Sequence, residues 1–431
     1  MRVLLFSVNL TVLGAMNEFM PPASVVVLEE RGVLDARDRL LAHRTGMSSR
    51  LTGHDGDHRC VEKIVFGNYV QSEEFLDVVL AEHAKRPFTA VIPGGEYTVA
   101  AAAFVAERLG LPGAGAAVAP LFGDKIALRE AIDRAGLPAP RWAEVDGAED
   151  VARFVAGAAG GSVLKPADRA GSQGIQLLDQ DSDLEQAWAH AVVGDESDPS
   201  VPARPLRRRF LIEQRMRGPE YTVGLLVRDG DVVFHHIGET LLFPGPHPLE
   251  RGHTFPAPIS AEVQAELLSV MRRLVAGIGL HTAILIADCI VTAAGPMVVD
   301  CAARPPGASF MFLVGLAYRV NITKALVSML SGEPVSMPSR PTGAAALRFC
   351  SGLPGVVTEI SGVAEARRVP GVVGVGIETR VGDVMVPLTS STARKAYVIA
   401  VGENPASAGS AAERGAAMVR IHTRPSANLV P

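Results

Sequence analysis

The stretch Ser162-Val-Leu-Lys-Pro-Ala-Asp-Arg-Ala-Gly-Ser-Gln-Gly-Ile-Gln-Leu-Leu178 reads as a strand, a flexible turn and a second strand. One lysine, Lys165, stands at the end of the first apolar run, shortly before a turn that contains two glycines. A lysine-proline pair before such a turn is often only the end of a strand. What Lys165 does must therefore be decided from the sequence around it.

The segments next to this stretch predict a small α/β unit over residues 141–192. A loop rich in Pro, Asp and Ser follows at 194–206, and then a strand at Phe210–Gln214. The longest basic run, Arg207-Arg-Arg209, is interpreted as a solvated loop edge. Further on, Asp229-Gly230 predicts a two-residue hairpin turn.

Before this unit, apolar runs alternate with helical periodicity from residue 1 to about 115. That alternation predicts a parallel sheet covered by helices. The turn Ile92-Pro-Gly-Gly-Glu96 follows a strand, where open α/β sheets place ligands, although a plain strand-to-helix turn is an equally good reading. Strands are expected at 2–8, 24–29, 62–67 and 88–93, and helices at 72–86 and 97–110.

A linker at Leu111-Pro-Gly-Ala-Gly115 leads to a helix expected over 122–135, which carries Lys125 near its start and ends at Gly136. Proline-rich residues 334–341 mark another boundary. The last 90 residues alternate short β-like runs with a final helix near 406–418.

A second informative stretch is Ile284-Leu-Ile-Ala-Asp-Cys-Ile-Val-Thr-Ala-Ala-Gly-Pro-Met-Val-Val-Asp-Cys-Ala-Ala-Arg304. It predicts a hairpin with a three-residue loop, Ala293-Ala-Gly295, which places Asp288 opposite Asp300. Opposed side chains are ~5 Å apart, and two carboxylates at that distance repel by roughly 3 kcal/mol at an effective dielectric near 20. A divalent cation such as Mg²⁺ would suit this pair. The alternative is a solvent-facing hairpin, or a pairing with Arg304.

Composition excludes several classes of protein. With 431 residues, 48% hydrophobic and 20% charged, the chain is expected to fold into two to three globular domains rather than to be disordered. The net charge of −5 gives no broad attraction to nucleic acid or to an anionic membrane, so neither is an expected partner.

The cysteines and the N-terminus bear on the compartment. Only four cysteines occur, with no Cys-x-x-Cys motif, so a disulfide framework or zinc site is not expected and a reducing cytoplasm fits. The opening Met1–Val8 resembles a short signal peptide but is interpreted as a first buried strand. No stretch approaches the ~20 apolar residues of a membrane span.

Several features occur in one order: lysines at 125 and 165, a glycine-rich turn, a glutamate in Leu211–Gln214 and the paired-carboxylate hairpin ending in Arg304. This order resembles the ATP-grasp superfamily of carboxylate–amine ligases over roughly residues 1–340. The L-amino acid ligases and related dipeptide synthetases look most similar. That similarity lies in Gly252-His-Thr-Phe-Pro-Ala-Pro-Ile259, in Ala303-Arg-Pro-Pro-Gly307 and in the region from Gly343-Ala-Ala-Ala-Leu-Arg-Phe349 to Ile421.

The resemblance implies an α/β fold, with α+β character in the ATP-grasp part. An N-terminal parallel α/β domain would span 1–115. An ATP-grasp domain would span 116–340, with its lid at about 140–215, and a small C-terminal α+β lobe at 341–431 would pack on the ATP-grasp core.

The resemblance also assigns roles in nucleotide binding. Lys165 would reach the ATP phosphates, and the loop Asp168–Gly174, with Ser172 and Gly174, would fold over them, since glycine lets backbone N–H groups approach a phosphate. Lys125 would supply a second cation, although a solvated lysine is the usual alternative. Glu213 would face the adenine and ribose. Glu220 matches a second glutamate of the family, but an ordinary surface role is nearly as good a reading.

The metal ligands of the family correspond to Asp288 and Asp300, and Arg304 would hold the carboxylate or the developing phosphate. Two departures stand out: the second acidic position is usually glutamate, and the asparagine expected two residues later is Ala302. His253 is a candidate to accept the proton of the amine or to orient the substrate, with a packed or solvated histidine as the alternative.

These assignments imply an ATP-dependent ligase of biosynthesis that joins an amino acid carboxylate to an amine, giving an amide, ADP and phosphate. ATP and Mg²⁺ would be its cofactors, with Mn²⁺ as a substitute, and its partners would be small molecules and a second copy in a homodimer. The rival interpretations are a catalytically impaired nucleotide-binding protein and a biotin-carboxylase-like or purine-pathway enzyme of the same superfamily.

Overall fold

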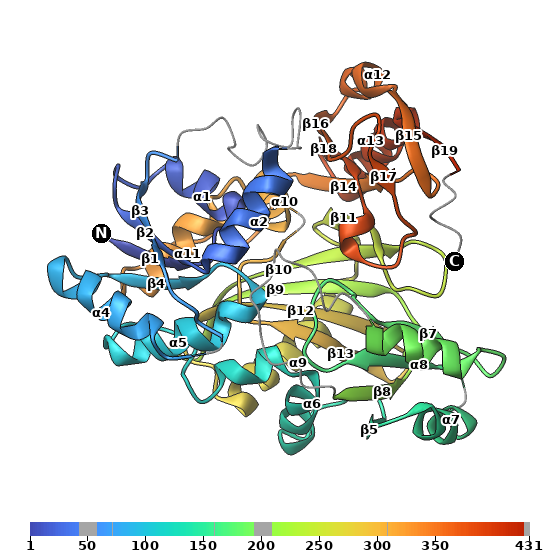
Figure 1. Cartoon of the computed structure of the whole chain (residues 1–431), viewed down its shortest axis with the longest axis horizontal. Coiled ribbons are helices and arrows are strands. Elements are labelled where there is room, and N and C mark those ends of the chain that lie inside the picture. Colours follow the sequence, from blue (N-terminus) through green and yellow to red (C-terminus); the bar gives the residue numbers. More distant parts are fainter. Residues whose placement is uncertain (43–57, 71, 159, 194–208, 308, 426–431) are drawn as a thin grey trace.

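A computed structural model describes residues 1–42, 58–70, 72–158, 160–193, 209–307 and 309–425 (Figure 1). Its first layer is a four-stranded sheet in the order β3-β2-β1-β4, with every pair parallel, so the parallel sheet predicted from the sequence is confirmed. Three of the strands, β1, β2 and β4, are mainly apolar and buried because helices cover both faces, whereas β3 at the edge is only partly buried. The four strands are β1 (Val3–Phe6), β2 (Val25–Glu29), β3 (Val61–Phe66) and β4 (Ala90–Pro93).

The helices of this layer include the two expected ones, α4 (Phe75–Lys85) and α5 (Val99–Arg108). Two further helices were not expected, α1 (Leu10–Asn17) and α2 (Arg31–Ala42). At the start of α1 the side chain of Asn9 accepts a hydrogen bond from the backbone N–H of Val12, at 3.0 Å, and so caps the helix.

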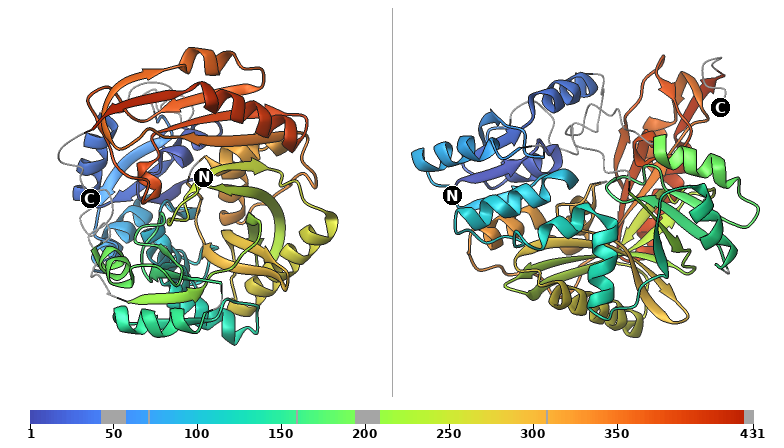
Figure 2. Two further views of the ribbon diagram at one scale, coloured as in Figure 1. Left: turned by 90° about the vertical axis from the view of Figure 1, so that its right-hand side faces the viewer. Right: turned by 60° about the horizontal axis from the view of Figure 1, so that its bottom comes forward.

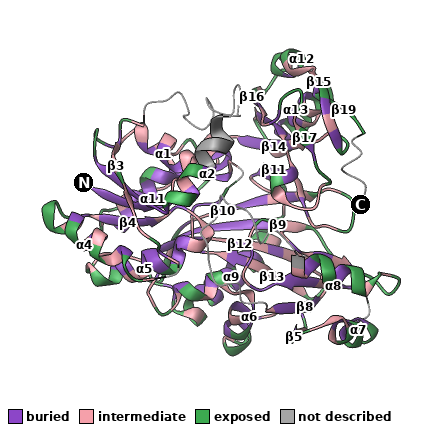
Figure 3. Ribbon diagram, in the orientation of Figure 1, coloured by how far each residue is buried: buried purple, intermediate pink, exposed green. Residues whose placement is uncertain are grey.

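The lid is a second four-stranded sheet in the order β5-β8-β6-β7, and all of its pairs are antiparallel. The stretch Ser162–Leu178 forms β6 and β7 with a turn between them, as predicted. Helices α7 and α8 lie on this sheet, and their outer faces are exposed in Figure 3. The elements are β5 (Trp142–Val145), β6 (Ser162–Pro166), β7 (Gln176–Leu178), β8 (Phe210–Gln214), α7 (Ala148–Ala156) and α8 (Leu184–Val193).

The largest element is an eight-stranded antiparallel sheet in the order β13-β12-β9-β10-β11-β14-β18-β16. The C-terminal strands continue the same sheet, away from the N-terminal layer (Figures 1 and 2). The strands are β9 (Glu220–Arg228), β10 (Asp231–Leu242), β11 (Glu250–Phe255), β12 (Ala283–Thr292), β13 (Gly295–Ala302), β14 (Ala344–Cys350), β16 (Val372–Ile377) and β18 (Ala396–Gly402).

The remaining elements cover this sheet or extend the C-terminal lobe. A small antiparallel sheet in the order β17-β15-β19 completes the lobe. The predicted final helix is confirmed as α13. The elements are α6 (Lys125–Arg134), α9 (Ala261–Ile278), α10 (Phe310–Tyr318), α11 (Ile322–Leu330), α12 (Val363–Arg368), α13 (Pro405–Met418), β15 (Gly355–Ser361), β17 (Val384–Met385) and β19 (Arg420–Arg424), with three short 3₁₀ helices, η1 (Glu96–Thr98), η2 (Ala119–Gly123) and η3 (Ser391–Ala393).

The carboxylate hairpin has the predicted register but a different turn. Thr292 pairs with Gly295, so the loop has two residues rather than three. A β-bulge next to Asp300 then adds one residue to β13 and restores the pairing of Asp288 with Asp300. The predicted three-residue loop was wrong, and the predicted pairing of the two aspartates is confirmed.

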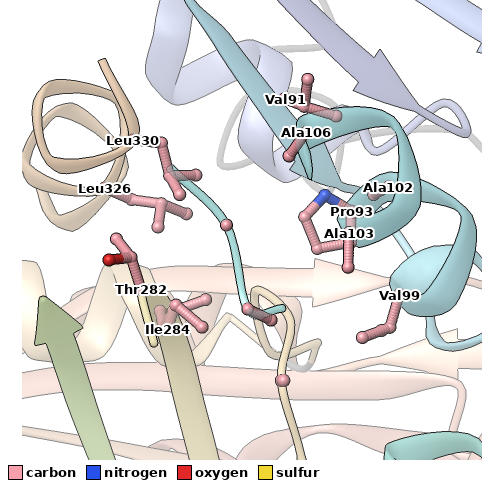
Figure 4. Close-up of a pocket in the computed structure, with 14 residues that line it drawn as sticks. Val91, Pro93, Val99, Ala102, Ala103, Ala106, Thr282, Ile284, Leu326 and Leu330 are labelled. Atoms are coloured by element: carbon pink, nitrogen blue, oxygen red, sulfur yellow. The ribbon is translucent and has the colours of Figure 1, made fainter. Parts of the chain in front are cut away.

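The N-terminal layer meets the large sheet along an apolar seam (Figure 4). Pro93 and Ala103 from β4 and α5 face Ile284 of β12 and Leu326 and Leu330 of α11 around a small cavity of about 20 Å³. Thr282 is the one polar residue of its lining. The seam is therefore a packing contact and not a binding site.

Among the described residues, no single helix is both long and apolar enough to cross a membrane. The helices α10 and α11 meet the length and apolarity limits only as a pair, which is bent by 102°.

Candidate active site

A cavity of about 490 Å³ lies between the lid and the large sheet. The hinge that joins lid to core, residues 214–220, forms one of its sides. Six of the residues singled out from the sequence line this cavity together, although they come from three separate segments: Lys165, Ser172, Glu213, Glu220, Asp288 and Asp300.

Lys165 is held by a buried charge cluster. Its Nζ lies 2.6 Å from Oε2 of Glu213 and donates to the carbonyl oxygen of Val299 at 3.1 Å. Arg129 of α6 pairs with the other oxygen of Glu213 and donates to the carbonyl oxygens of Val298 and Val299 at 2.7 and 2.8 Å. Both oxygens of Glu213 are therefore occupied by cations, which was not foreseen for a residue expected to face the adenine and ribose.

Glu213 is ionised by this arrangement. Burial alone would raise the pKa of its carboxyl, but the charges of Lys165 and Arg129 outweigh burial and lower the pKa to about 2. Arg129 was missed in the sequence because an arginine on an amphipathic helix is normally exposed, and here it is 2% exposed.

Lys125, at the first turn of α6, reaches the hairpin from the other side. Its Nζ lies 3.4 Å from Oδ2 of Asp300 and donates to the carbonyl oxygen of Arg169 in the lid loop at 3.0 Å. Burial would lower the pKa of this lysine, but the carboxylates of Asp300 and Glu96 outweigh burial and raise it. Lys125 is thus a charged bridge between the carboxylate hairpin and the lid.

The acidic wall of the cavity has unequal charge compensation. Burial raises the pKa of Asp300, but Lys125 and Lys165 outweigh it and lower the pKa overall. Among the described residues, the one hydrogen bond to the side chain of Asp288 comes from the hydroxyl of Thr222, at 3.0 Å. The pKa of Asp288 is raised by burial and by the charges of Asp300 and Glu250.

Glu220 resembles Asp288, because burial and the charges of Asp288 and Glu250 raise its pKa. Within the described residues, neither Glu220 nor Asp288 has an ion-pair partner within 4.0 Å. Two half-buried carboxylates that lack such a partner fit a site for Mg²⁺. In the described parts of the chain no three His, Cys, Asp or Glu side chains are grouped closely enough to hold an ion by themselves. A bound Mg²⁺ would therefore need phosphate or water oxygens as further ligands.

Arg304 and the turn at 92–96 were singled out separately, and the structure brings them together. The Nε of Arg304 donates to Oε2 of Glu96 at 2.5 Å, across 208 residues of sequence. The turn needs glycine at its tip, because a Cβ at Gly94 would lie 2.4 Å from the carbonyl oxygen of Phe6. Glu96 was missed as a site residue because nothing local distinguishes it from a helix-starting glutamate.

The lid loop is strongly bent. Ser172 has a φ of 60° and Gly174 a φ of 73°, in the left-handed region. The hydroxyl of Ser172 donates to the carbonyl oxygen of Pro248 at 3.3 Å, which ties the loop to the segment between β10 and β11. Ser172 lines the cavity, and Gly174 instead packs on Pro166, where an added Cβ would lie 2.8 Å from the ring.

His253 lies in the core of the large sheet and not in the cavity lining. It is 1% exposed, its ring centre lies 4.3 Å from that of Phe310 with the two rings tilted by 52°, and its Nδ1 lies 3.4 Å from the hydroxyl of Thr240. Burial, with the charges of Arg394 and Arg348, lowers its pKa to about 3. The packed alternative describes His253, because a side chain enclosed in this way has no path to a substrate amine.

Two family models match parts of the chain. Residues 160–309 match the family model of the ATP-grasp domain, and residues 348–424 match the family model of the L-amino acid ligase C-terminal domain 2. An uncharacterized protein, y4rH, of Sinorhizobium fredii is 26% identical over 359 residues, which cover 82% of this chain and 73% of that protein.

Two further proteins are similar in part or in fold. A D-alanine–D-alanine ligase of Desulforudis audaxviator is 33% identical over 124 residues, covering 28% of this chain and 37% of that ligase. The crystal structure of an L-amino acid ligase from Bacillus licheniformis superposes with a TM-score of 0.77 at 18% identity and covers 98% of both chains.

Proposed function

We propose that the chain, whose residues 160–309 match the ATP-grasp domain and whose last lobe matches that of the L-amino acid ligases, is an ATP-dependent ligase of the ATP-grasp superfamily that joins the carboxylate of an amino acid to an amine. The amine would be a second amino acid or a short peptide. The reaction would pass through an acyl phosphate and release ADP and phosphate.

The observation that carries this proposal is the charge distribution of the 490 Å³ cavity. Lys165 stands at one side, and the uncompensated carboxylates of Glu220 and Asp288 stand at another. A nucleotide with its phosphates bound to a divalent cation is complementary to both sides.

On the nucleotide side, Lys165 and Lys125 would bind phosphate oxygens from two directions. Glu213 and Arg129 would act through Lys165, because they fix its ammonium group within a buried cluster. The hinge residues that line the cavity would pack against the base.

Glu220, Asp288 and Asp300 are the candidates for holding Mg²⁺, and phosphate or water oxygens would have to complete its ligands, because the three carboxylates are not grouped closely enough to hold the ion by themselves. When bound, the ion supplies positive charge that neutralises the phosphate oxygens. Lys125, which already bridges Asp300 and the lid loop, would hold the lid over the phosphates and exclude water from the reactive acyl group.

On the substrate side, Arg304 is the candidate for the carboxylate. Its planar guanidinium pairs with oxyanions, and its present partner, Glu96, occupies the place of such an oxyanion. An incoming amino acid would exchange with this pair, its carboxylate on Arg304 and its ammonium on Glu96.

The proposed reaction has two chemical steps. In the first, a carboxylate oxygen attacks the γ-phosphorus of ATP, the bond to the β-phosphate oxygen breaks, and ADP leaves. In the second, a neutral amine attacks the acyl carbon, the bond from carbon to phosphate oxygen breaks, and the leaving phosphate takes up the proton that the nitrogen loses. Arg304 would stabilise the negative charge on the acyl oxygen between these events.

One observation favours a second candidate, a nucleotide-binding protein with impaired catalysis. Asp300 has one carboxylate oxygen near Lys125 and the other on the backbone N–H of Cys301, at 2.9 Å, and Ala302 beside it offers no ligand atom. The metal-binding capacity of the hairpin is reduced to that extent.

The deciding experiment measures ADP and phosphate release with Mg·ATP against a matrix of single and paired amino acids and short peptides, with mass spectrometry of the products. Release that depends on one acid–amine pair and yields the matching amide mass would establish the ligase. Tight Mg·ATP binding without release for any pair would instead favour the second candidate.

A further inference from the structure

A segment of the C-terminal lobe lies behind the lining of the cavity and contacts it from outside. A strap, defined as residues 390–394, contains η3 and precedes β18. It contacts two parts of the site that are far from it in sequence, the lid loop and Glu250 of the acidic wall.

The first contact holds the lid loop. The backbone N–H of Ser391 donates to the carbonyl oxygen of Gly171 at 3.1 Å. On its other side the lid is held by the segment before β11, since the N–H of Leu177 donates to the carbonyl oxygen of Pro246 at 2.9 Å. The lid loop is thus fastened between the large sheet and the C-terminal lobe.

The second contact fixes Glu250, which lines the cavity. Nη1 of Arg394 donates to Oε2 of Glu250 at 2.7 Å and to its carbonyl oxygen at 3.2 Å. The Nε of Arg394 donates to the carbonyl oxygen of Ser391 at 3.1 Å, and the guanidinium lies 4.0 Å from the ring centre of Phe349. The side chain is 8% exposed, and its Nε and Nη1 groups are both held by these hydrogen bonds.

The position of this ion pair gives it a role in nucleotide binding. Glu250 shares the cavity with Glu220 and Asp288, which have no cation of their own within the described structure. Without Arg394, a third uncompensated carboxylate would face the phosphates. A single added charge in a partly enclosed cavity acts over ~10 Å and is screened by salt.

We propose that the strap is a working part of the nucleotide site, in which Arg394 positions and neutralises Glu250 and the backbone of Ser391 fastens the closed lid. Arg394 is a positioning residue, since it acts through Glu250. This inference rests on the nucleotide site of the proposed function but not on the identity of the acid or the amine.

The Arg394 part is tested by the affinity for ADP in the absence of Mg²⁺, measured by calorimetry. We expect Arg394→Met to lower the affinity for ADP at least fivefold at low salt and less than twofold at 0.5 M salt. In a Glu250→Gln background the same substitution should change the affinity less than twofold. Arg414→Met, at an exposed position of α13, is the matched control.

An equal loss in both backgrounds, or a loss that salt does not change, would overturn the role assigned to Arg394. If Arg394→Met does not fold, Arg394→Lys replaces it. Lysine keeps the charge and loses the second hydrogen bond, so its ADP affinity should stay within threefold of the parent.

The lid part is tested with two substitutions at one position. Ser391→Pro removes the N–H donor at a place that accepts proline, because Ser391 is the first residue of η3 and Ser390 before it is extended. Ser391→Ala keeps the N–H. We expect the protection from hydrogen exchange that Mg·ADP gives to residues 168–174 to be at least fivefold smaller in Ser391→Pro than in the parent. In Ser391→Ala it should equal that of the parent.

Equal protection in the two variants would reject the fastening role. Both measurements use ADP binding alone, so they remain decisive if no acid–amine pair is ligated and the proposed function fails.

Discussion

At the scale of the residue, the cluster of Lys165, Glu213 and Arg129 in the candidate active site also contributes to the free energy of unfolding. Glu213 has a folded pKa of about 2, below its usual value of 4.5. Its ionised form therefore stabilises the fold at pH values above about 4.5, and this contribution is lost as the pH falls from 4.5 toward 2. The contribution is on the order of 3 kcal/mol.

The corresponding prediction compares the parent protein with Glu213→Gln. We expect the variant to have a lower free energy of unfolding at pH 6, and the difference to shrink as the pH falls from about 4.5 toward 2. Urea denaturation at several pH values measures this. A difference that stays constant over that range would show that the charge of Glu213 does not carry the effect.

Arg129 provides a second prediction. Arg129→Met should lower the free energy of unfolding by about 3 kcal/mol, because it leaves a buried carboxylate and two backbone carbonyls short of a donor. Arg134→Met, at an exposed position of the same helix, should change it by less than about 0.5 kcal/mol. Comparable losses in the two variants would contradict the buried cluster.

Lys165→Ala should weaken Mg·ATP binding roughly 10- to 100-fold, because it removes one charge-assisted hydrogen bond to a phosphate oxygen. Lys324→Ala, which removes an exposed lysine of α11, should leave the affinity unchanged. Calorimetric titration with a non-hydrolysable ATP analogue is the measurement, and unchanged affinity in the Lys165 variant would reject its role.

Asp288→Asn should act in opposite directions on stability and on binding. Removing one of two neighbouring uncompensated carboxylates relieves repulsion, so thermal unfolding without metal should occur at a higher temperature than in the parent. The gain in nucleotide affinity that Mg²⁺ gives over EDTA should be largely lost in the same variant. A lower unfolding temperature together with an unchanged effect of Mg²⁺ would count against the metal site.

At the scale of the element, two glycines of the large sheet make room for rings on the facing strand. A Cβ at Gly224 of β9 would lie 2.1 Å from Nε2 of His236 of β10, and a Cβ at Gly238 would lie 2.3 Å from the ring of Phe255. Gly224→Ala should cost about 2 kcal/mol through overpacking. His236→Ala in the same chain should restore part of that loss, which thermal melts of the single and double variants would measure.

The sequence predicted correctly those features that are encoded within a single stretch of residues. The parallel N-terminal sheet, the turn at Asp229-Gly230 and the pairing of Asp288 with Asp300 follow from local alternation and turn chemistry. The bulge in β13 was not predictable, because the residue that it adds belongs to the apolar pair Val298-Val299, which hides the shift in the alternation. Helices α1 and α2 were missed because apolar strand-like runs lie directly before them.

Contacts between distant segments account for the rest of the site. Glu96 meets Arg304 across 208 residues, and Arg129 meets Val298 across 169 residues. No local period or spacing records such pairs. The opposite case is His253. The sequence offered it as a candidate for proton transfer, with a packed histidine as the alternative, and the structure encloses it within the sheet.

At the scale of the whole molecule, the C-terminal lobe and the ATP-grasp core share one sheet. The proposed boundary at residue 340 falls between β11 and β14, which pair through residues 252–255 and 345–348. Removing residues 341–431 would expose β11 as an unpaired edge and uncover its buried face.

We therefore expect a chain ending at residue 340 to aggregate or to lack cooperative unfolding, as judged by size-exclusion chromatography and circular dichroism. A monomeric fragment with a sharp thermal transition would show that the C-terminal lobe is an independent unit.

The hinge between lid and core, residues 214–220, is also a side of the cavity. A nucleotide packed against these residues would restrict the torsion angles through which the lid must swing to release it. The residence time of the nucleotide would then be set by the rate at which the lid opens. Substitutions that tighten nucleotide binding at the hinge should slow product escape in proportion, and turnover would be governed by departure of ADP rather than by bond formation.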